Sequence, residues 1–399
     1  MECTRKITED LVYVGASDRR ISKFENIFPI AKGVSYNSYV LLDEKTVLFD
    51  TADYSVGRQF FENVEYALNG KKLDYLIINH MEPDHCALIE QIIGKYKDVK
   101  IVGNSKTFQM MKQFFDFNVD EYSYIVSEND TLCVGKHILT FVMAPMVHWP
   151  EAMVTYDISD KILFSADAFG TFGALDGNIF SDEMNFDRDK LDEARRYYTN
   201  IVGKYGIPVQ TLLKKASALE INMICPLHGP IFRENLSCIL SKYDKWSKYE
   251  AEENGVVIAY ASMYGNTENA ANVLANLLSV NGVNNIEVFD VSNVDVSEII
   301  SKIFKYSYVV LAAPTYNSGI YPKMENLLTD MKALSVQNKK FAVIENGTWA
   351  STAGKQIKDI ILSMKNNEII EEIVSIRSSL KPNQIDEMKK LAKTIASYM

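Results

Sequence analysis

The pattern of predicted strands and helices changes at Gly255, and this change constrains the fold more than any other feature. Up to about Ser237, short β-rich runs alternate with polar turns and occasional helices, which favours a largely antiparallel or mixed arrangement. After Gly255, buried strands alternate with helices, which predicts a parallel, doubly wound sheet. A chain of 399 residues is also too long for one ordinary core. We therefore predict two domains, residues 1–250 of α+β character and residues 251–399 of α/β character.

The predicted strands and helices follow this division. In the first domain, strands are expected at residues 39–42, 46–49, 75–78, 100–102, 137–141, 154–157 and 162–164, and helices at 56–68, 108–115 and 188–205. In the second domain, strands are expected at 256–261, 287–290, 308–313, 341–345 and 372–376, and a helix at 268–280. The charged stretch 241–254 is expected to connect the two domains.

Charge and cysteine content exclude several classes of protein. The formal net charge of −10 argues against a nucleic-acid partner, because an acidic surface is repelled by phosphates. The first residues are not followed by the apolar core of a signal peptide, and we expect no membrane span. The five cysteines include no C-x-x-C pair, which indicates reduced thiols in the cytoplasm. They are Cys3, Cys86, Cys133, Cys225 and Cys238.

A dense group of possible metal ligands follows the predicted strand at 75–78. The run from His80 to His85 reads H-M-E-P-D-H, so that four of its six side chains can bind a metal. Because the preceding residues 73–79 are mostly apolar, this run is expected to leave a buried strand, where α/β proteins commonly place their chemistry. A structural role alone does not explain such a concentration in a chain with only five histidines.

Three further candidate ligands also follow buried strands. His148 comes after the apolar run 141–147, Asp167 after 162–166 and His228 after 224–227. Residues at the ends of neighbouring strands can converge on one point. His137 has no such context and is expected to be a hydrogen-bonded core or surface residue. Seven ligands suit two metals that share a carboxylate better than one tetrahedral ion. Nitrogen with several carboxylate oxygens favours iron or manganese and leaves zinc open.

Three polar loops of the second domain form a candidate cofactor site. Each follows a predicted strand, so that all three lie at the edge where a doubly wound sheet binds ligands. The first joins a strand to a helix and can hold a phosphate through hydroxyls and backbone N–H groups, without the lysine of a nucleotide-binding P-loop. The residues are Ser262, Met263, Tyr264, Gly265, Asn266 and Thr267; Pro314, Thr315, Tyr316, Asn317 and Gly319; and Asn346, Gly347, Thr348 and Trp349.

The run H-x-E-x-D-H with the later histidines and Asp167 resembles the metallo-β-lactamase-like domain of flavodiiron proteins. The three later loops resemble the FMN loops of flavodoxin, so the resemblance covers the whole chain. It implies an αββα sandwich followed by a flavodoxin-like sheet. Zinc hydrolases on the same scaffold generally carry a second histidine where this chain has Glu82. Glu82 is therefore the residue that best separates an oxidoreductase from a hydrolase.

The resemblance also implies roles for individual residues. His80, Glu82 and His148 would bind one iron, Asp84, His85 and His228 the other, and Asp167 would bridge them. The first FMN loop would hold the phosphate, and the other two would surround the isoalloxazine. Trp149 matches a tryptophan that the family keeps beside the metal site. Many relatives also carry an early histidine near the substrate pocket, but here the corresponding residues 24–28 read F-E-N-I-F.

The activity implied by this resemblance is four-electron reduction of dioxygen to water, or coupling of two nitric oxide molecules to nitrous oxide. The sequence does not choose between these gases. A rubredoxin-type protein is the expected electron donor, and a head-to-tail homodimer, or a dimer of dimers, is the expected assembly. Two alternatives stay open: a dinuclear zinc hydrolase with a flavodoxin-like domain, and an electron carrier whose metal domain is degenerate.

Overall fold

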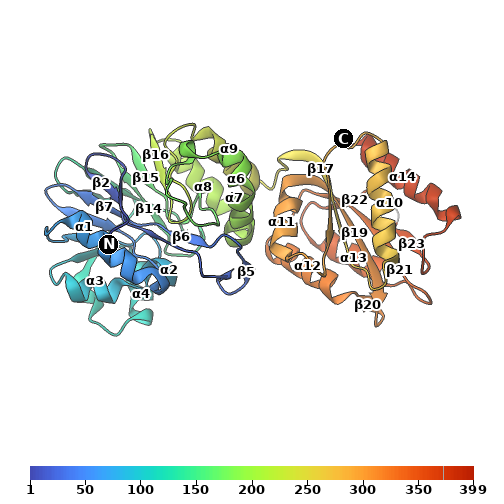
Figure 1. Ribbon diagram of the computed structural model, residues 1–399, viewed down its shortest axis with the longest axis horizontal. Helices are drawn as coiled ribbons and strands as arrows, with labels where there is room; N and C mark the ends of the chain where they lie inside the picture. The colour runs from blue at the N-terminus through green and yellow to red at the C-terminus, as the bar shows by residue number, and fades with distance from the viewer. Residues whose placement is uncertain (372) are drawn as a thin grey trace. The chain divides into compact units, whose positions relative to one another are not determined.

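The computed structural model describes residues 1–371 and 373–399, which divide into two compact units (Figure 1). The first unit comprises Met1–Tyr198 and Ile207–Asp244, and the second comprises Thr199–Gly206 and Lys245–Met399. The predicted boundary at residue 250 stays a prediction, because compactness alone does not show where an independently folding domain ends.

The first unit contains two sheets with a shared apolar core. One sheet has the order β1-β2-β7-β8-β9-β10-β11, antiparallel as far as β8 and parallel from there on. Its strands are β1 (Arg5–Lys6), β2 (Leu11–Tyr13), β7 (Tyr39–Leu42), β8 (Thr46–Phe49), β9 (Tyr75–Ile77), β10 (Lys100–Gly103) and β11 (Ser123–Ile125). This mixed arrangement confirms the prediction for the first half of the chain.

The second sheet packs against the first. It runs β12 (Thr131–Cys133), β13 (Ile138–Met143), β14 (Met153–Asp157), β15 (Ile162–Phe164) and β16 (Met223–Cys225), antiparallel except for the β15–β16 pair. Buried side chains of both sheets form one cluster, in which the rings of Phe49 and Phe164 stack with centroids 3.7 Å apart. This cluster fixes the two sheets relative to each other and so brings their strand ends together.

Helices and short hairpins complete the structure up to residue 247. The helices are α1 (Gly57–Leu68), α2 (Pro83–Cys86), α3 (Ile89–Lys95), α4 (Ser105–Phe114), α5 (Val119–Tyr122), α6 (Phe186–Asp189), α7 (Leu191–Tyr197), α8 (Gly206–Ala216) and α9 (Ser237–Ser247). Two hairpins that the sequence pattern did not predict are β3 (Ala16–Asp18) with β6 (Val34–Tyr36), and β4 (Lys23–Phe24) with β5 (Phe28–Pro29). The sequence pattern missed them because two- and three-residue strands are too short to show an alternation.

The single helix predicted at 188–205 is wrong. Lys190 has a non-helical backbone conformation and separates α6 from α7. After Tyr197 the chain continues as a five-residue π-helix, Tyr198–Val202, and then as a tighter 3₁₀ turn. Glycines at 203 and 206 weaken the helical preference of this stretch, because glycine loses more backbone entropy than other residues in a helix.

The second unit is a parallel sheet covered by helices. Its order is β18-β17-β19-β21-β22, and β23 also pairs in parallel with β21. The strands are β17 (Glu253–Tyr260), β18 (Ile286–Asp290), β19 (Tyr306–Tyr316), β21 (Lys340–Asn346), β22 (Glu368–Ile369) and β23 (Val374–Ile376), and β20 (Gly319–Ile320) is a short antiparallel addition to β19. The predicted doubly wound sheet is confirmed. Of the strand predicted at 372–376, residue 372 lies outside the described residues.

The helices of the second unit are α10 (Asn266–Val280), α11 (Val296–Lys305), α12 (Pro322–Ala333), α13 (Ala353–Ser363) and α14 (Ile385–Ser397). Apolar side chains of α10 and α14 pack together against the sheet. The strand order 2-1-3-4-5 is that of flavodoxin-like proteins, which bind their ligand at the carboxyl ends of the strands. Among the described helices, none combines the length and the apolar character that crossing a membrane requires.

Candidate metal centre and flavin pocket

The predicted metal ligands lie on loops at the carboxyl ends of strands from both sheets of the first unit. The run from His80 follows β9, His148 follows β13, Asp167 follows β15 and His228 follows β16. Pro83 begins the short helix α2, which carries Asp84 and His85 in its single turn. All four histidines and Asp167 are buried. The two-sheet fold therefore collects all seven predicted side chains in one buried place.

Four of these side chains form one group: His80, Glu82, His148 and Asp167. Glu82 Oε2 lies 3.3 Å from His80 Nε2 and 3.0 Å from His148 Nε2. Asp167 Oδ2 lies 3.3 Å and 3.1 Å from the same two nitrogens. Two ring nitrogens and two carboxylate oxygens thus surround one point.

The other three side chains form a second group beside it: Asp84, His85 and His228. Asp84 Oδ2 lies 3.4 Å from His85 Nε2 and 3.3 Å from His228 Nε2. Asp167 Oδ1 lies 3.1 Å from His85 Nε2 and 3.7 Å from His228 Nε2. Asp167 therefore presents one oxygen to each group, as a bridging carboxylate does.

The donor set fits a pair of hard or borderline cations. The Nε2 atoms of His85 and His228 face each other at 3.0 Å. Both carboxylate oxygens of Asp84 and Oδ1 of Asp167 are buried without a hydrogen-bond partner among the described residues. Buried carboxylates are costly unless they are paired or bind a metal. Nitrogen and carboxylate oxygen together suit iron or manganese.

Outer contacts orient the ligand rings. His80 Nδ1 lies 2.8 Å from Glu151 Oε1, which also accepts the Met81 N–H at 2.8 Å. His228 Nδ1 lies 2.7 Å from the carbonyl oxygen of Ser35. Such partners fix the ring so that Nε2 faces the metal. The sequence pattern did not single out Glu151 or Ser35, and no local motif marks either of them.

The carboxylates change the protonation of the metal-free site. Burial lowers the pKa of His85 and of His148, but the facing carboxylates outweigh it and raise each pKa to about 9. Burial likewise opposes ionisation of Asp167, yet the surrounding histidines hold its pKa well below the usual range. Metal binding must therefore displace protons from these histidines.

Aromatic rings pack against the ligand histidines. The rings of Phe24 and Tyr197 lie 5.3 Å and 5.5 Å from the His228 ring, centroid to centroid. The Tyr197 hydroxyl is buried without a hydrogen-bond partner among the described residues, and its pKa is raised by burial and by the carboxylates, Asp167 first. Trp149 packs edge-on against His80, at 5.3 Å between centroids.

Glu25 occupies the stretch in which the sequence shows no early histidine. It lies in the turn between β4 and β5 with a left-handed backbone, φ 48°. The residue is solvent-exposed overall, yet partial burial of the carboxyl group, followed by the charge of Glu82, raises its pKa to about 8. The sequence pattern missed Glu25 and Tyr197 because neither belongs to the ligand motif.

His137 lies apart from the two groups, as expected. It is buried, and its Nδ1 lies 2.7 Å from Asp157 Oδ2. Asp160 is close enough to form a small cluster with this pair. The contact explains why a histidine is accommodated in the core without a place among the predicted ligands.

The three polar loops of the second unit surround a cavity of about 320 Å³. Twelve predicted residues line it, whereas Gly265, Tyr316 and Gly319 do not. Gly265 has φ 83° just before α10, and its N–H donates to Ser262 Oγ at 3.1 Å. The cavity lies at the amino end of α10, where backbone N–H groups favour a phosphate.

Cross-links between loops hold this cavity together, and three lining residues were not predicted. Asn346 Nδ2 donates to Thr267 Oγ1 at 3.3 Å and to the carbonyl oxygen of Ser378 at 2.9 Å. Ser378 Oγ donates to Thr348 Oγ1 at 3.1 Å. The additional lining residues are Ser318, Ala350 and Ser378. The arrangement of hydroxyls and amides at a helix start, with exposed Trp349 beside them, fits a phosphorylated planar cofactor.

Comparisons with known proteins identify both halves of the chain. Residues 34–229 match the family described as ODP family beta lactamase, and residues 258–370 match flavodoxin. An anaerobic nitric oxide reductase flavorubredoxin of Aliivibrio fischeri is 30% identical over 385 residues, which are 95% of this chain and 76% of that protein.

Solved structures agree over nearly the whole chain. Rubredoxin oxygen:oxidoreductase from Desulfovibrio gigas is 28% identical, with a TM-score of 0.90 over 99% of this chain and 98% of that one. The flavodiiron protein from Giardia intestinalis is 24% identical and has the same fold, with a TM-score of 0.93 over 100% and 98% of the two chains. This chain therefore belongs to the flavodiiron proteins, oxidoreductases that combine a non-haem diiron centre with FMN.

Proposed function

We propose that this protein reduces dioxygen to water, nitric oxide to nitrous oxide, or both, at a diiron centre supplied with electrons by FMN. One observation supports this most directly: Asp167 presents its two oxygens to two separate histidine–carboxylate groups. The relatives point to both gases, since one is named a nitric oxide reductase and the other an oxygen oxidoreductase. Nitric oxide reduction as the main activity is the alternative.

We assign the seven residues to the two irons as the geometry groups them. His80, Glu82 and His148 hold one iron and Asp84, His85 and His228 the other, with Asp167 between them. When bound, the two irons and FMN supply the redox chemistry and store the electrons. The residues of the chain bind and orient these groups. Glu82 contributes a hard oxygen ligand, which favours iron over a zinc site richer in histidine.

Two other side chains have the chemistry to handle protons at the site. The hydroxyl of Tyr197 stays protonated at neutral pH, because burial and the nearby carboxylates raise its pKa. It can therefore donate a hydrogen bond toward a bound gas. The carboxyl group of Glu25, whose pKa is raised first of all by burial, can hold a proton near Glu82. Both reactions consume protons, so a donor beside the site has an evident use.

We assign FMN to the cavity of the second unit. The loop of Ser262, Met263, Tyr264, Gly265, Asn266 and Thr267 would hold the phosphate, and the loops of Pro314, Thr315, Tyr316, Asn317 and Gly319 and of Asn346, Gly347, Thr348 and Trp349 would surround the ring system. Gly265, Tyr316 and Gly319 belong to these loops without lining the cavity. Support comes from the cavity itself and from its cross-linked loops.

The same proposal includes a cytoplasmic location. The free buried thiols of Cys86 and Cys225 suit a reducing compartment.

The electron donor and the assembly complete the proposal. A rubredoxin-type protein is the proposed donor, because the name of the Desulfovibrio gigas protein joins rubredoxin to oxygen reduction. The proposed assembly is a head-to-tail homodimer, or a dimer of dimers, in which the flavin of one chain serves the irons of another. Tyr264 and Trp349 at the flavin cavity are 90% and 93% exposed in the single chain, which leaves aromatic surface for a partner.

Metal analysis and rapid kinetics test the proposed function. The purified protein should contain two irons and one FMN per chain. Stopped-flow oxidation of the fully reduced protein by dioxygen and by nitric oxide, compared side by side, should show fast multi-electron oxidation with at least one gas. Two zincs per chain with no redox turnover would support the hydrolase alternative instead. Unchanged gas reduction in Glu82→Ala would support the electron-carrier alternative.

A further inference from the structure

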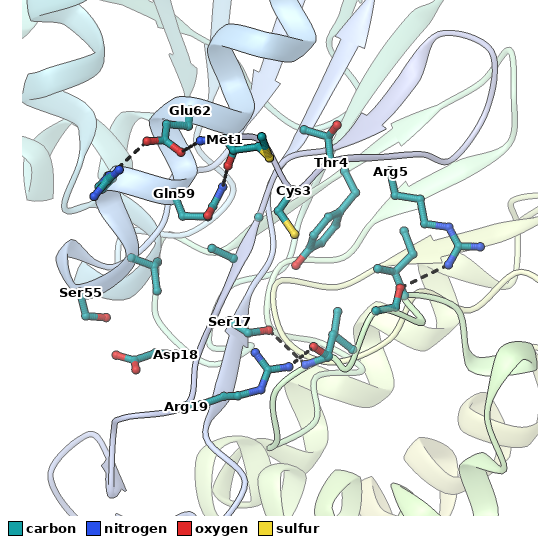
Figure 2. Close-up of a pocket in the computed structure, with 18 of the residues that line it drawn as sticks. Met1, Cys3, Thr4, Arg5, Ser17, Asp18, Arg19, Ser55, Gln59 and Glu62 are labelled. Atoms are coloured by element: carbon teal, nitrogen blue, oxygen red, sulfur yellow. Dashed lines mark hydrogen bonds and ion pairs between the residues drawn. The ribbon is translucent and has the colours of Figure 1, made fainter.

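The first unit contains another cavity, which none of the seven proposed metal ligands lines (Figure 2). Its volume of about 780 Å³ is within the range of small-molecule sites. In Figure 2, residues of the N-terminal segment, of β3 and of the start of α1 surround the same space. The loop that carries Leu175 and Ile179 also contributes to the lining.

The cavity has an apolar floor. Five of its apolar lining residues are buried, with at most 8% of each exposed: Tyr13, Ala16, Val56, Leu175 and Ile179. Apolar surface that is held open in a cavity favours a ligand with an apolar or planar body, because binding removes that surface from water.

The charged part of the lining is mostly arginine. Arg5, Arg19, Arg20 and Arg58 line the cavity, against the two carboxylates of Asp18 and Glu62. Each of these arginines has a carboxylate partner: Glu183 for Arg5, Asp176 for Arg19, Asp18 for Arg20 and Glu62 for Arg58. The cavity therefore attracts an anion through the guanidinium N–H groups that these pairs leave over, in a chain whose net charge is −10. Cations gathered around a concave, partly apolar surface attract an anion more strongly than scattered surface charges do.

Hydrogen bonds to the protein position these arginines but do not use all of their N–H donors. Arg19 donates from Nη2 to the carbonyl oxygen of Leu175 and to Asp176. Arg20 donates from Nη2 to the carbonyl oxygen of Ser55, and Arg58 from Nε to Glu62. A guanidinium has five N–H donors. Within the described part of the chain, Nε and Nη1 of Arg19 and both Nη groups of Arg58 keep theirs available for a ligand.

We propose that this cavity binds a small organic anion, a carboxylate or phosphate attached to an apolar or aromatic body. The arginines bind the anionic group, for which the planar guanidinium fork is well suited, and the apolar floor takes the body. The ligand would rest on β3, which pairs with β6. The carbonyl oxygen of Ser35 in β6 holds the ring of His228, so the site lies one strand away from a proposed iron ligand.

Calorimetric titration of the iron- and FMN-loaded protein tests this proposal, because the flavin pocket is then filled. Adenosine 5′-monophosphate and decanoate serve as the phosphate and carboxylate probes, and inorganic phosphate as the probe without a body. We expect saturable one-to-one binding of at least one of the first two. Binding of neither, or equally tight binding of inorganic phosphate, would overturn the proposal.

A double variant, Arg19→Ala with Arg58→Ala, tests the location of the site. The two side chains are 54% and 91% exposed, so their removal leaves the core intact. We expect binding at least about tenfold weaker, since charge-assisted hydrogen bonds are lost. Arg188→Ala is the matched control, because Arg188 is an exposed, ion-paired arginine outside the cavity, and it should bind as the wild type does. Equal binding by the double variant, or equal weakening by the control, would refute the assignment.

Discussion

The Nε2 atoms of His85 and His228 lie 3.0 Å apart in the buried interior of the first unit. At most one proton can be shared between two such nitrogens, and Asp84 and Asp167 beside them have carboxylate oxygens without a hydrogen-bond partner among the described residues. Protons can give a partner to only some of these nitrogen and oxygen atoms. A cation bound between the nitrogens and the oxygens gives a partner to all of them. The first prediction therefore concerns the carboxylate that both groups share.

Asp167→Asn should remove most of the iron. An amide keeps the size of the side chain but lacks the charge and the second anionic oxygen that a bridge requires. We expect the affinity for iron to fall by more than about 100-fold, beyond the loss typical of an outer-sphere change, while FMN content stays normal. Metal analysis after chelator challenge measures this, with the exposed Asp176→Asn as a control. Two irons retained in Asp167→Asn would contradict the assignment of the bridge.

Glu151→Ala should loosen the metal without touching a ligand. The substitution leaves His80 Nδ1 and the Met81 N–H without their shared acceptor. We expect iron affinity to fall by about 10- to 100-fold, and the free energy of unfolding to drop by ~1–3 kcal/mol. Glu151→Gln retains an acceptor, so its iron affinity should lie between that of the wild type and that of Glu151→Ala. Chelator competition on the three proteins checks this order, and an unchanged affinity in Glu151→Ala would exclude the orienting role.

These two residues show which part of the site a sequence can reveal. The ligands were predictable, because each is a metal-binding side chain placed just after an apolar strand. Glu151 and Ser35 were not, since their roles depend on contacts with His80 and His228, 71 and 193 residues away along the chain. Such pairings are decided by how the two sheets pack, which no local pattern records.

Tyr197→Phe should reduce turnover without weakening the protein. The hydroxyl is buried and has no hydrogen-bond partner among the described residues, so removing it relieves a desolvation cost of ~1–3 kcal/mol. We expect unchanged iron and FMN, equal or greater stability, and kcat with the preferred gas about tenfold lower, which corresponds to ~1.4 kcal/mol. Tyr156→Phe is the control, because it removes a hydrogen bond to the Glu220 carbonyl oxygen away from the metals. It should lower the stability and leave turnover unchanged. Normal turnover in Tyr197→Phe would exclude the hydroxyl from the reaction.

Thr267→Val should weaken FMN binding and leave the iron in place. Valine keeps the shape of this buried side chain but removes the hydroxyl beside the proposed phosphate position. Loss of a hydrogen bond to a charged group costs ~1.5–3 kcal/mol, which is about 10- to 150-fold in affinity. Fluorescence titration of the FMN-free protein measures the change. Thr329→Val, which removes an exposed hydroxyl within α12, is the control, and equal affinities in all three proteins would refute the placement.

The fold of the second unit was easier to predict than that of the first. Its long strands and amphipathic helices alternate regularly, and the order of β18, β17 and β19 follows from the parallel connections. In the first unit, β3 to β6 are only two or three residues long and are held by their surroundings. Ser378 reaches the flavin cavity through a left-handed turn, φ 68°, that has no sequence motif.

Lys339 should make the stability of the second unit rise with pH. Its side chain is buried, and Nζ donates to the carbonyl oxygens of Phe304 and Tyr306 at 3.1 Å and 2.9 Å. Burial lowers the pKa of Lys339 to about 7, with Glu252 opposing the shift. Between pH 7 and the unfolded pKa of about 10.4 the unfolded chain binds more protons, so unfolding becomes less favourable as pH increases.

The expected gain between pH 7 and pH 9 is ~1–3 kcal/mol for the wild type, and the gain should largely vanish in Lys339→Met, which cannot titrate. Denaturant unfolding of the FMN-loaded protein reports on this unit when the release of the flavin is used as the signal. The control is Lys332→Met, because Lys332 is exposed on α12 and its loss should leave the pH dependence as it is. The same slope in Lys339→Met as in the wild type would show that another group causes the pH dependence, since methionine carries no ionisable proton at this position.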